Sequence, residues 1–525
     1  MRIIPRVKKL DGTGKCIGLG EGLNIYCDDP IFERLSFTLC ELLPGVKLSY
    51  VNCKNASNLI FTVDKNIERA EGYRITVEDS VILCRFSDFL GGRNAIATLA
   101  QIIYPVNGGI AISDVDIEDY PDADFRSFMH DIGRKYLPLD ELKAHILLMA
   151  KCKMNILHFH FSEAVGFGIK LKKFPELPGA QGMQYTEDEI RELVDYAEKL
   201  GIDIIPEIDV PGHSNVFTSA HPEVACTPIG GKSTNGWAMC VGAEDTYTFL
   251  EELVREVSKL FKSKYFHLGT DEISMRDEKR VPHPIADWLI CSRCCKLMEK
   301  HGYTNEVELF YYFLKRIYKI VTDQGKRLII WNDWIDISKS PDIPRDILIE
   351  FWRVAASTRG PHIGCSMQRF LEEGFDVINA NYPDTYIDLY VNYERLCTWD
   401  FKRVPATDEN TPGKIIGGDV CAWDVHSHFA HSIPVSIVLF ADKLWRRDNR
   451  LGTDFLMDAS RMLIGNERIS VFDYTRDVIM LDDVGEIFKS DTDREALEQA
   501  LLEVEPRDIS ERYCKSVYLS YINKA

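Results

Sequence analysis

The chain has 525 residues, of which 45% are hydrophobic and 27% are charged, and its formal net charge is −19 at pH 7. This length and composition indicate a globular protein of two or three domains with a sizeable core. The acidic balance disfavours nucleic acid or an anionic membrane as the partner, and the sequence contains no apolar run long enough to suggest a membrane span.

The N-terminal segment and the cysteines favour a cytoplasmic location. Residues 1–9 carry charge but no apolar core of signal-peptide length, although a signal removed beforehand would leave no trace here. The fifteen cysteines are odd in number and include Cys84 and Cys421 in apparent core segments, which favours reduced thiols. The cluster Cys291-Ser-Arg-Cys294-Cys295 is interpreted as incidental, because no second Cys or His pair stands at zinc-knuckle spacing.

Residues 1–120 are predicted to form a small, non-catalytic α/β domain. Alternating or apolar runs at 59–63, 73–77 and 81–86 have the pattern of strands. Residues 94–103 have the pattern of a helix that covers these strands. The acidic, proline-containing stretch 114–124 marks the boundary of the domain.

From Phe125 onward, strand and helix patterns alternate regularly. The predicted strands are Phe125–Asp131, Met154–Phe161, Ile202–Ile208, Tyr265–Gly269, Arg327–Trp331, Ile347–Trp352, Asp376–Asn381 and Ile415–Trp423. The predicted helices include Leu139–Ala150, Thr186–Leu200, Thr246–Phe261, Val307–Thr322 and Ile433–Trp445. Eight strands that alternate with helices are typical of a (β/α)8 TIM barrel. We therefore predict an α/β protein with a catalytic barrel over 121–452 and a C-terminal helical extension over 453–525.

The stretch Tyr265–Glu272 begins as an apolar strand and ends in two adjacent carboxylates, Asp271 and Glu272. Side chains alternate along a strand, so His267, Gly269 and Asp271 are expected to share the inward face. Active sites of TIM barrels lie at the C-terminal ends of the strands. Two crowded carboxylates at such an end indicate acid–base chemistry, because burial and mutual repulsion separate their pKa values.

Polar and aromatic residues also lie at or near the C-terminal ends of the other predicted strands. They are Asp131, Arg134, His158, His160, Glu163, Glu207, Asp209, His213, Trp331, Asn332, Asp333, Trp352, Arg353, Tyr386, Asp388, Trp423 and Asp424. Indoles stack on the apolar faces of sugars, while charged side chains bind sugar hydroxyls. This mixture favours a carbohydrate as the ligand.

Four of these segments resemble motifs of glycoside hydrolase family 20, the β-N-acetylhexosaminidases. The segment His267-Leu-Gly-Thr-Asp271-Glu272 is close to that family's His-x-Gly-Gly-Asp-Glu. Asp131-Ile-Gly-Arg134, Asn155-Ile-Leu-His-Phe-His160 and Pro206-Glu-Ile-Asp-Val-Pro-Gly-His213 support the resemblance. It extends over the small domain and the barrel, and it implies an exo-acting, retaining enzyme in which the substrate's own 2-acetamido oxygen attacks the anomeric carbon.

The resemblance also implies roles for individual residues. Glu272 would be the general acid and later the general base, Asp271 would accept the acetamido N–H, and Tyr386 would donate to the acetamido oxygen. The remaining expected substrate-site residues are Trp331, Trp352 and Trp423 as an aromatic box, Arg134 and Asp388 for hydroxyls, and His213 paired with Glu163. Three positions depart from the family pattern, namely Thr270 for glycine, Glu163 for aspartate and Val425 for glutamate.

The expected partner is an oligosaccharide or glycoconjugate with a terminal β-linked N-acetylhexosamine, and no cofactor or metal is expected. A homodimer is left open. One alternative is a metal-dependent barrel hydrolase, because His158-Phe-His160 is a His-x-His at a strand end. A second alternative is a sugar-binding relative without catalysis, because fold alone does not imply activity.

Overall fold

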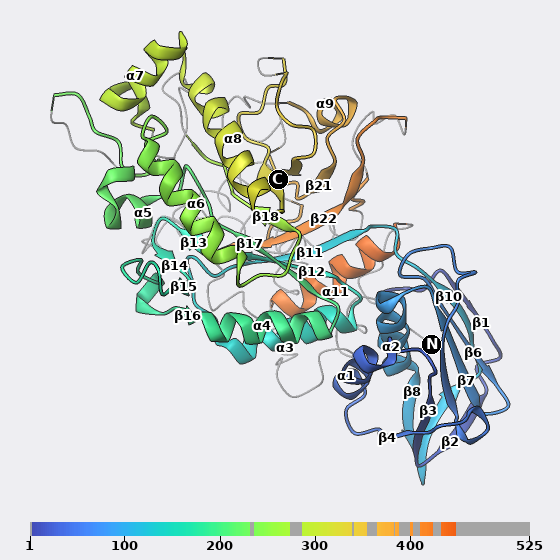
Figure 1. The fold of residues 1–525 in the computed structure, drawn as a ribbon. Helices are drawn as coiled ribbons and strands as arrows, with labels where there is room; N and C mark the ends of the chain where they lie inside the picture. The colour runs from blue at the N-terminus through green and yellow to red at the C-terminus, as the bar shows by residue number, and fades with distance from the viewer. Residues whose placement is uncertain are drawn as a thin grey trace, which may run out of the picture.

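The computed structural model describes residues 3–230, 236–273, 286–338, 341–353, 365–382, 384–387, 399–402, 410–423 and 432–447. These residues form a small α/β domain beside a closed eight-stranded barrel (Figure 1). The predicted fold class is therefore confirmed. The extension predicted for 453–525 lies outside the described residues.

The small domain is built on a seven-stranded sheet. Its strands run in the order β1 (Lys9–Asp11), β10 (Asp116–Asp119), β6 (Tyr73–Glu78), β7 (Val81–Phe86), β5 (Leu59–Val63), β3 (Gly22–Tyr26) and β4 (Lys47–Tyr50). A second sheet contains β2 (Cys16–Gly20), β9 (Gly109–Ser113) and β8 (Ile103–Val106). Helices α1 (Phe32–Leu42) and α2 (Phe89–Ile102) lie between the large sheet and the barrel (Figure 1). The predicted helix 94–103 began too late, because Asp88 caps α2 by accepting from the N–H of Gly91.

Eight parallel strands close the barrel, and each lies within two residues of its predicted bounds. They are β11 (Phe125–Asp131), β12 (Ile156–His160), β17 (Asp203–Glu207), β18 (Tyr265–His267), β19 (Arg327–Trp331), β20 (Leu348–Phe351), β21 (Val377–Asn379) and β22 (Ile415–Ala422). The ring is closed because β11 pairs with both β12 and β22.

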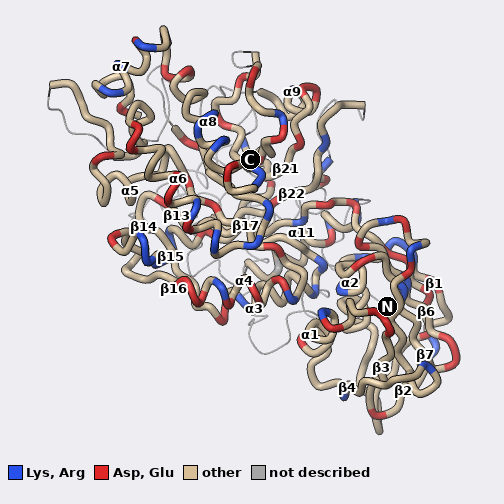
Figure 2. The backbone as a smooth tube through the Cα atoms, in the orientation of Figure 1, with Lys and Arg blue, Asp and Glu red and all other residues tan. Residues whose placement is uncertain are grey.

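Amphipathic helices surround the strands where the sequence predicts them. They are α3 (Leu139–Lys151), α4 (Glu187–Lys199), α6 (Glu244–Ser258), α8 (Glu306–Asp323) and α11 (Ser432–Trp445). The short helix α9 (Met367–Glu372) was not among the predicted helices. Thr186 and Glu189 form a capping box at the start of α4, as their spacing suggests. In Figure 2, both acidic and basic residues lie along helices such as α3 and α4. This distribution is typical of a solvated surface.

The barrel interior is layered. At the N-terminal end of the strands, an apolar cluster contains Phe125, Ile156, Ile205, Ile329, Leu348 and Ile378. Above it lie the buried polar side chains of His158, Glu207, His267, Glu350 and Asp419. Met129, Trp331, Trp352, Ala380 and Cys421 form a further apolar cluster toward the C-terminal end. The apolar layer closes the lower end, so the functional groups gather at the upper end.

A buried polar cluster joins the two domains. Lys153, which follows α3, forms an ion pair of 2.8 Å with Asp119 of β10, and neither side chain is exposed. Asp119 also accepts from the hydroxyl of Tyr73 and the indole of Trp445, at 2.6 and 2.9 Å. Burial lowers the pKa of Lys153, and Asp119 opposes this shift.

Among the described helices, none combines the length and apolarity that a bilayer crossing requires.

We predict that Asp119→Ala destabilises the protein by about 3–5 kcal/mol, because the Lys153 ammonium is left buried without its counter-charge. Urea denaturation followed by circular dichroism measures the change. Glu21→Ala is the matched control, since it removes a carboxylate whose ion pair with Lys47 is largely exposed. A stability loss no larger than that of the control would show that the cluster does not hold the domains together.

Candidate active site

Strand β18 ends at His267, and the chain then turns sharply. Gly269, Thr270 and Glu272 all have positive φ, at 60°, 80° and 51°. The predicted alternation of one inward face through Gly269 and Asp271 is therefore wrong, because a strand cannot continue through these conformations. Gly269 is required here, since a Cβ at this position would lie 2.0 Å from Asp209 Oδ1. The turn nevertheless leaves Asp271 buried.

The two carboxylates after this turn have different surroundings. The side chain of Asp271 is 9% exposed and that of Glu272 is 14% exposed. His213 Nε2 lies 3.7 Å from both Asp271 Oδ2 and Glu272 Oε2, and Arg353 Nη2 lies 3.9 Å from Glu272 Oε1. Burial raises the pKa of Asp271 to about 6, with Glu272 adding to the effect and His213 opposing it.

His213 connects this pair of carboxylates to a second ionic group. Its Nδ1 lies 2.6 Å from Glu163 Oε1, and Glu163 also pairs with Arg134, which binds Asp131 at 2.6 Å. Burial opposes a charged imidazole, but Glu163 raises the pKa of His213 to about 9. Burial likewise opposes a charged Glu163, but Arg134 and His213 lower its pKa to about 2. The site therefore holds an imidazolium–carboxylate pair beside Glu272.

Trp237 is a site residue that the sequence reasoning missed. Its ring lies 4.3 Å from that of His213, centre to centre, and its indole donates to the backbone oxygen of Glu272 at 3.3 Å. Trp237 lies in a loop far along the chain from any strand end, so the sequence pattern did not predict that it reaches the site. Arg353 was noted at a strand end, but its proximity to Glu272 was not anticipated.

The three predicted indoles gather with Tyr386 at the top of the barrel. Trp423 lies 5.9 Å from Trp331 and 6.3 Å from Tyr386, and Trp352 stacks on Tyr386 at 6.1 Å. The indoles of Trp331 and Trp352 donate to Glu207 and Asp333, at 3.0 and 2.6 Å. The buried Nε1 of Trp423 has no hydrogen-bond partner within the described part of the chain.

The layer below these rings is ionic. His158 places Nε2 2.9 Å from Glu207 and Nδ1 2.8 Å from Asp419, so both ring nitrogens are engaged by carboxylates. His267 Nδ1 lies 3.1 Å from Glu207, and His160 Nδ1 contacts the same carboxylate. Burial opposes charge on His158, yet Glu207 and Asp419 raise its pKa well above the ordinary value. All these contacts lie within the layer itself, which is typical of a structural support, although His160 Nε2 and His267 Nε2 are buried without a hydrogen-bond partner among the described residues.

The structure thus brings nearly all the predicted site residues together at one end of the barrel. They are Asp271, Glu272, His213, Glu163, Arg134, Trp331, Trp352, Trp423 and Tyr386. Arg134 joins the ionic group to the aromatic one, since its guanidinium lies 5.3 Å from the centre of the Trp423 ring. Asp388 and Val425 lie outside the described residues.

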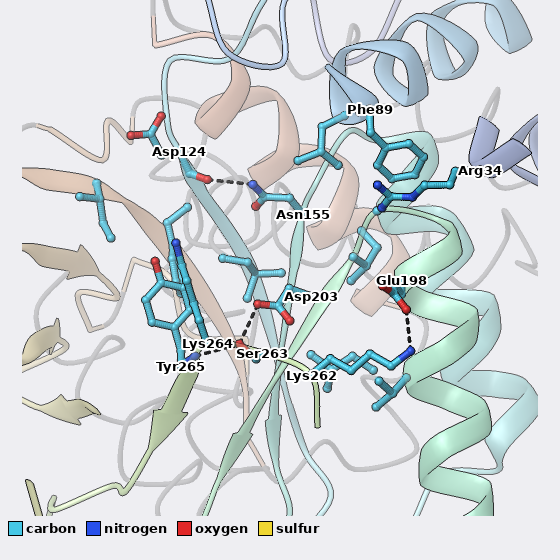
Figure 3. A pocket seen from close by; sticks show the side chains of 18 residues that line it. Arg34, Phe89, Asp124, Asn155, Glu198, Asp203, Lys262, Ser263, Lys264 and Tyr265 are labelled. Atoms are coloured by element: carbon cyan, nitrogen blue, oxygen red, sulfur yellow. Dashed lines mark hydrogen bonds and ion pairs between the residues drawn. The ribbon is translucent and has the colours of Figure 1, made fainter. Parts of the chain in front are cut away.

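A pocket at the opposite end of the barrel lacks these groups. It is lined by the beginnings of several barrel strands and by Phe89 and Leu90 of α2 (Figure 3). Its polar side chains bind one another, since Lys262 pairs with Glu198 and Ser263 donates to Asp203. The pocket lies on the face that carries stability rather than catalysis in TIM barrels. We therefore place the candidate active site at the C-terminal end of the strands.

Sequence comparisons identify the family that the chain resembles. The profile of "Glycosyl hydrolase family 20, catalytic domain" matches residues 124–434, and that of "Glycosyl hydrolase family 20, domain 2" matches residues 1–120. A β-hexosaminidase of Porphyromonas gingivalis is 34% identical over 44% of this chain and 31% of its own length. A β-hexosaminidase of Vibrio furnissii is 29% identical over 61% of this chain and 53% of its own length. The chain thus spans from about a third to about half of the length of these two relatives.

Solved structures show a similar fold. The exo β-N-acetylglucosaminidase of Vibrio harveyi superposes with a TM-score of 0.74 at 22% identity, covering 88% of this chain and 76% of that one. The β-N-acetylhexosaminidase of Bacteroides fragilis gives a TM-score of 0.74 at 24% identity, covering 88% and 95%. Both likenesses support the arrangement of a small domain and a barrel.

We predict that His213 stays protonated up to about pH 9 and that Glu163→Gln lowers the pKa of His213 by more than about one unit. Burial lowers this pKa, and the variant loses the negative charge that counteracts burial. NMR titration of histidine-labelled protein measures both values, with a His213 variant to assign the signal. Glu223→Gln is the control, since Glu223 pairs with the distant His221. An unchanged His213 titration in Glu163→Gln would contradict the pairing.

Proposed function

The chain belongs to glycosyl hydrolase family 20, and we propose that it is an exo-acting, retaining β-N-acetylhexosaminidase. Its substrate would be an oligosaccharide or glycoconjugate with a terminal β-linked N-acetylglucosamine or N-acetylgalactosamine. The observation that carries this proposal is the pair Asp271 and Glu272 beside His213, at the barrel end that also holds the indoles.

Glu272 is the proposed general acid. It is the more exposed of the two carboxylates, so it can reach the glycosidic oxygen of a bound sugar. Its proton would pass to that oxygen as the bond breaks, and its carboxylate would then take a proton from the attacking water. The charged His213 and Arg353 lie 3.7 and 3.9 Å away and would stabilise the carboxylate form after the first step.

Asp271 and Tyr386 are proposed to hold the acetamido group. The Asp271 carboxylate would accept its N–H, and the Tyr386 hydroxyl would donate to its oxygen, so that this oxygen attacks the anomeric carbon. A positive oxazolinium-like intermediate forms in this step. A buried carboxylate stabilises such a cation strongly, because little water screens the interaction.

The remaining residues are proposed to bind and orient the sugar. Trp331, Trp352 and Trp423 form apolar walls, and the indole N–H of Trp423, which has no partner among the described residues, offers a donor to a sugar oxygen. Arg134 is a donor for ring hydroxyls, and its pairing with Glu163 and Asp131 fixes the direction of its guanidinium. Glu163 in turn holds His213 in place. The role of Asp388 in binding hydroxyls stays a prediction.

The two alternative functions receive less support. A metal-dependent hydrolase with a His-x-His site would need a nitrogen from both His158 and His160, but both nitrogens of His158 contact carboxylates, which leaves only His160 Nε2 without a hydrogen-bond partner among the described residues. A binding protein without catalysis is disfavoured because Asp271, Glu272 and Tyr386 occur together, and substrate-assisted hydrolysis needs this combination whereas sugar binding alone does not. The proposed location is the cytoplasm, and in its support every cysteine within the described residues is a free thiol.

We predict that Glu272→Gln lowers kcat on a chitobiose-type disaccharide by about 10²–10⁴-fold with little change in binding, because the amide cannot protonate the leaving group. Aryl N-acetylglucosaminides should lose less activity, since their leaving groups need less protonation. Steady-state kinetics on both substrates measure the two losses, and Glu251→Gln, at an exposed position of α6, is the control variant. A near wild-type rate on the disaccharide would disprove the role of Glu272.

We predict that activity on acetamido substrates falls as the pH drops below about 6, because Asp271 becomes protonated there. Asp271→Asn should lower kcat and remove this acidic limb from the pH profile. Plain glucosides should be very poor substrates, and a thiazoline analogue of the cyclised intermediate should inhibit more tightly than N-acetylglucosamine. Efficient glucoside cleavage, or a sugar ester on Asp271 in mass spectra, would refute substrate assistance.

A further inference from the structure

Four cysteine sulfurs meet in one buried place away from the active site. They belong to Cys226, Cys240, Cys291 and Cys294, and all four sulfur atoms lie within 4.8 Å of one another. Cys240 Sγ is 3.5 Å from Cys291 Sγ and 3.7 Å from Cys294 Sγ. Cys226 is 6% exposed and the other three are fully buried.

The spacing of these sulfurs fits a tetrahedral metal ion. Zinc binds thiolates at about 2.3 Å, so two ligands of a regular tetrahedron lie about 3.8 Å apart. The two measured separations agree with this value. They are much longer than a disulfide bond of about 2.0 Å, and the four residues are free thiols.

The backbone around the cluster is arranged as in a closed metal site. Cys291 and Cys294 lie at the start of α7 (Ser292–His301), with the C-x-x-C spacing of zinc ligands. The N–H of Thr227 donates to Cys291 Sγ at 3.3 Å, which favours a thiolate there. Gly242 permits a close approach of the two segments, since a Cβ would lie 2.5 Å from the backbone nitrogen of Cys294.

We propose that Cys226, Cys240, Cys291 and Cys294 form a structural zinc site that joins two loops above the barrel. One loop follows β17 and contributes Cys226 and Cys240, and the other follows β18 and contributes Cys291 and Cys294. Four protein ligands leave no position open for substrate or water, so the ion takes no part in the reaction.

The zinc site would affect catalysis only by fixing the position of Trp237. Trp237 lies three residues before Cys240 on the first loop and contacts both His213 and the backbone of Glu272. Trp288, three residues before Cys291 on the second loop, donates its indole N–H to Met239 O at 2.9 Å. A metal that ties the loops together therefore fixes Trp237 against the proposed acid.

This proposal replaces the interpretation of Cys291–Cys295 as incidental. That interpretation required a second pair at zinc-knuckle spacing along the chain. The second pair instead comes from Cys226 and Cys240, and Cys240 lies 51 residues before Cys291. Cys295 is not part of the cluster, since its thiol faces the backbone oxygens of Trp288 and Leu289.

The test is the metal content of the full chain, purified without chelators or a histidine tag. Mass spectrometry of the metals should find about one zinc ion per chain, and a mercurial that blocks thiols should release it to a chromogenic chelator. Cys240→Ser and Cys294→Ser should lose most of this zinc and melt at a lower temperature. Cys295→Ser is the matched control and should retain both zinc and melting temperature.

Three results would overturn the proposal: folded wild-type protein without zinc, stoichiometric iron in its place, or disulfides among the four cysteines. Full zinc in Cys240→Ser would do so as well. If the serine variants do not fold, cobalt substitution of the wild type decides, since four thiolates give intense charge-transfer bands and an oxygen-rich site does not. Glu272→Gln should keep its zinc while losing turnover, so this test is independent of the proposed hydrolase activity.

Discussion

The upper half of the barrel depends on one buried carboxylate, that of Glu207. It accepts from or pairs with the rings of His158, His160, His267 and Trp331. A charge in so dry a place is tolerated only when each of its oxygens is engaged, and four rings are held in place as a result. Trp331 is one wall of the aromatic group, so the shape of the upper end follows from an ionic network beneath it.

The same network shapes the electrostatics of the site. Burial, Asp271 and Glu207 together raise the pKa of Asp209 well above its usual value, which favours a neutral Asp209 behind the turn at Gly269. Burial and neighbouring carboxylates also raise the pKa of Asp271. Positive charge is supplied by His213, which Glu163 keeps protonated. The positive charge of His213 lies among the carboxylates of Glu163, Asp271 and Glu272. Attraction between opposite charges therefore offsets the cost of burying these groups close together.

The strands and most of their functional ends could be predicted from sequence, because periodicity is a local property. Strands β11 and β19 match their predicted bounds fully. The errors come from non-local geometry. Gly269 lies too close to Asp209 for a side chain, Trp237 reaches the site on a long loop, and Cys226 meets Cys291 only after two loops pack together. No spacing rule contains that information.

Thr270 is a source of local instability in the turn that precedes Asp271. A β-branched residue at φ 80° is strained, and its hydroxyl is buried without a hydrogen-bond partner among the described residues. Both features lower stability at the residue directly before Asp271. A glycine at this position would tolerate the same φ and would remove the buried hydroxyl. The strain and the unpartnered hydroxyl are thus properties of the threonine side chain, and the turn that places Asp271 does not itself require them.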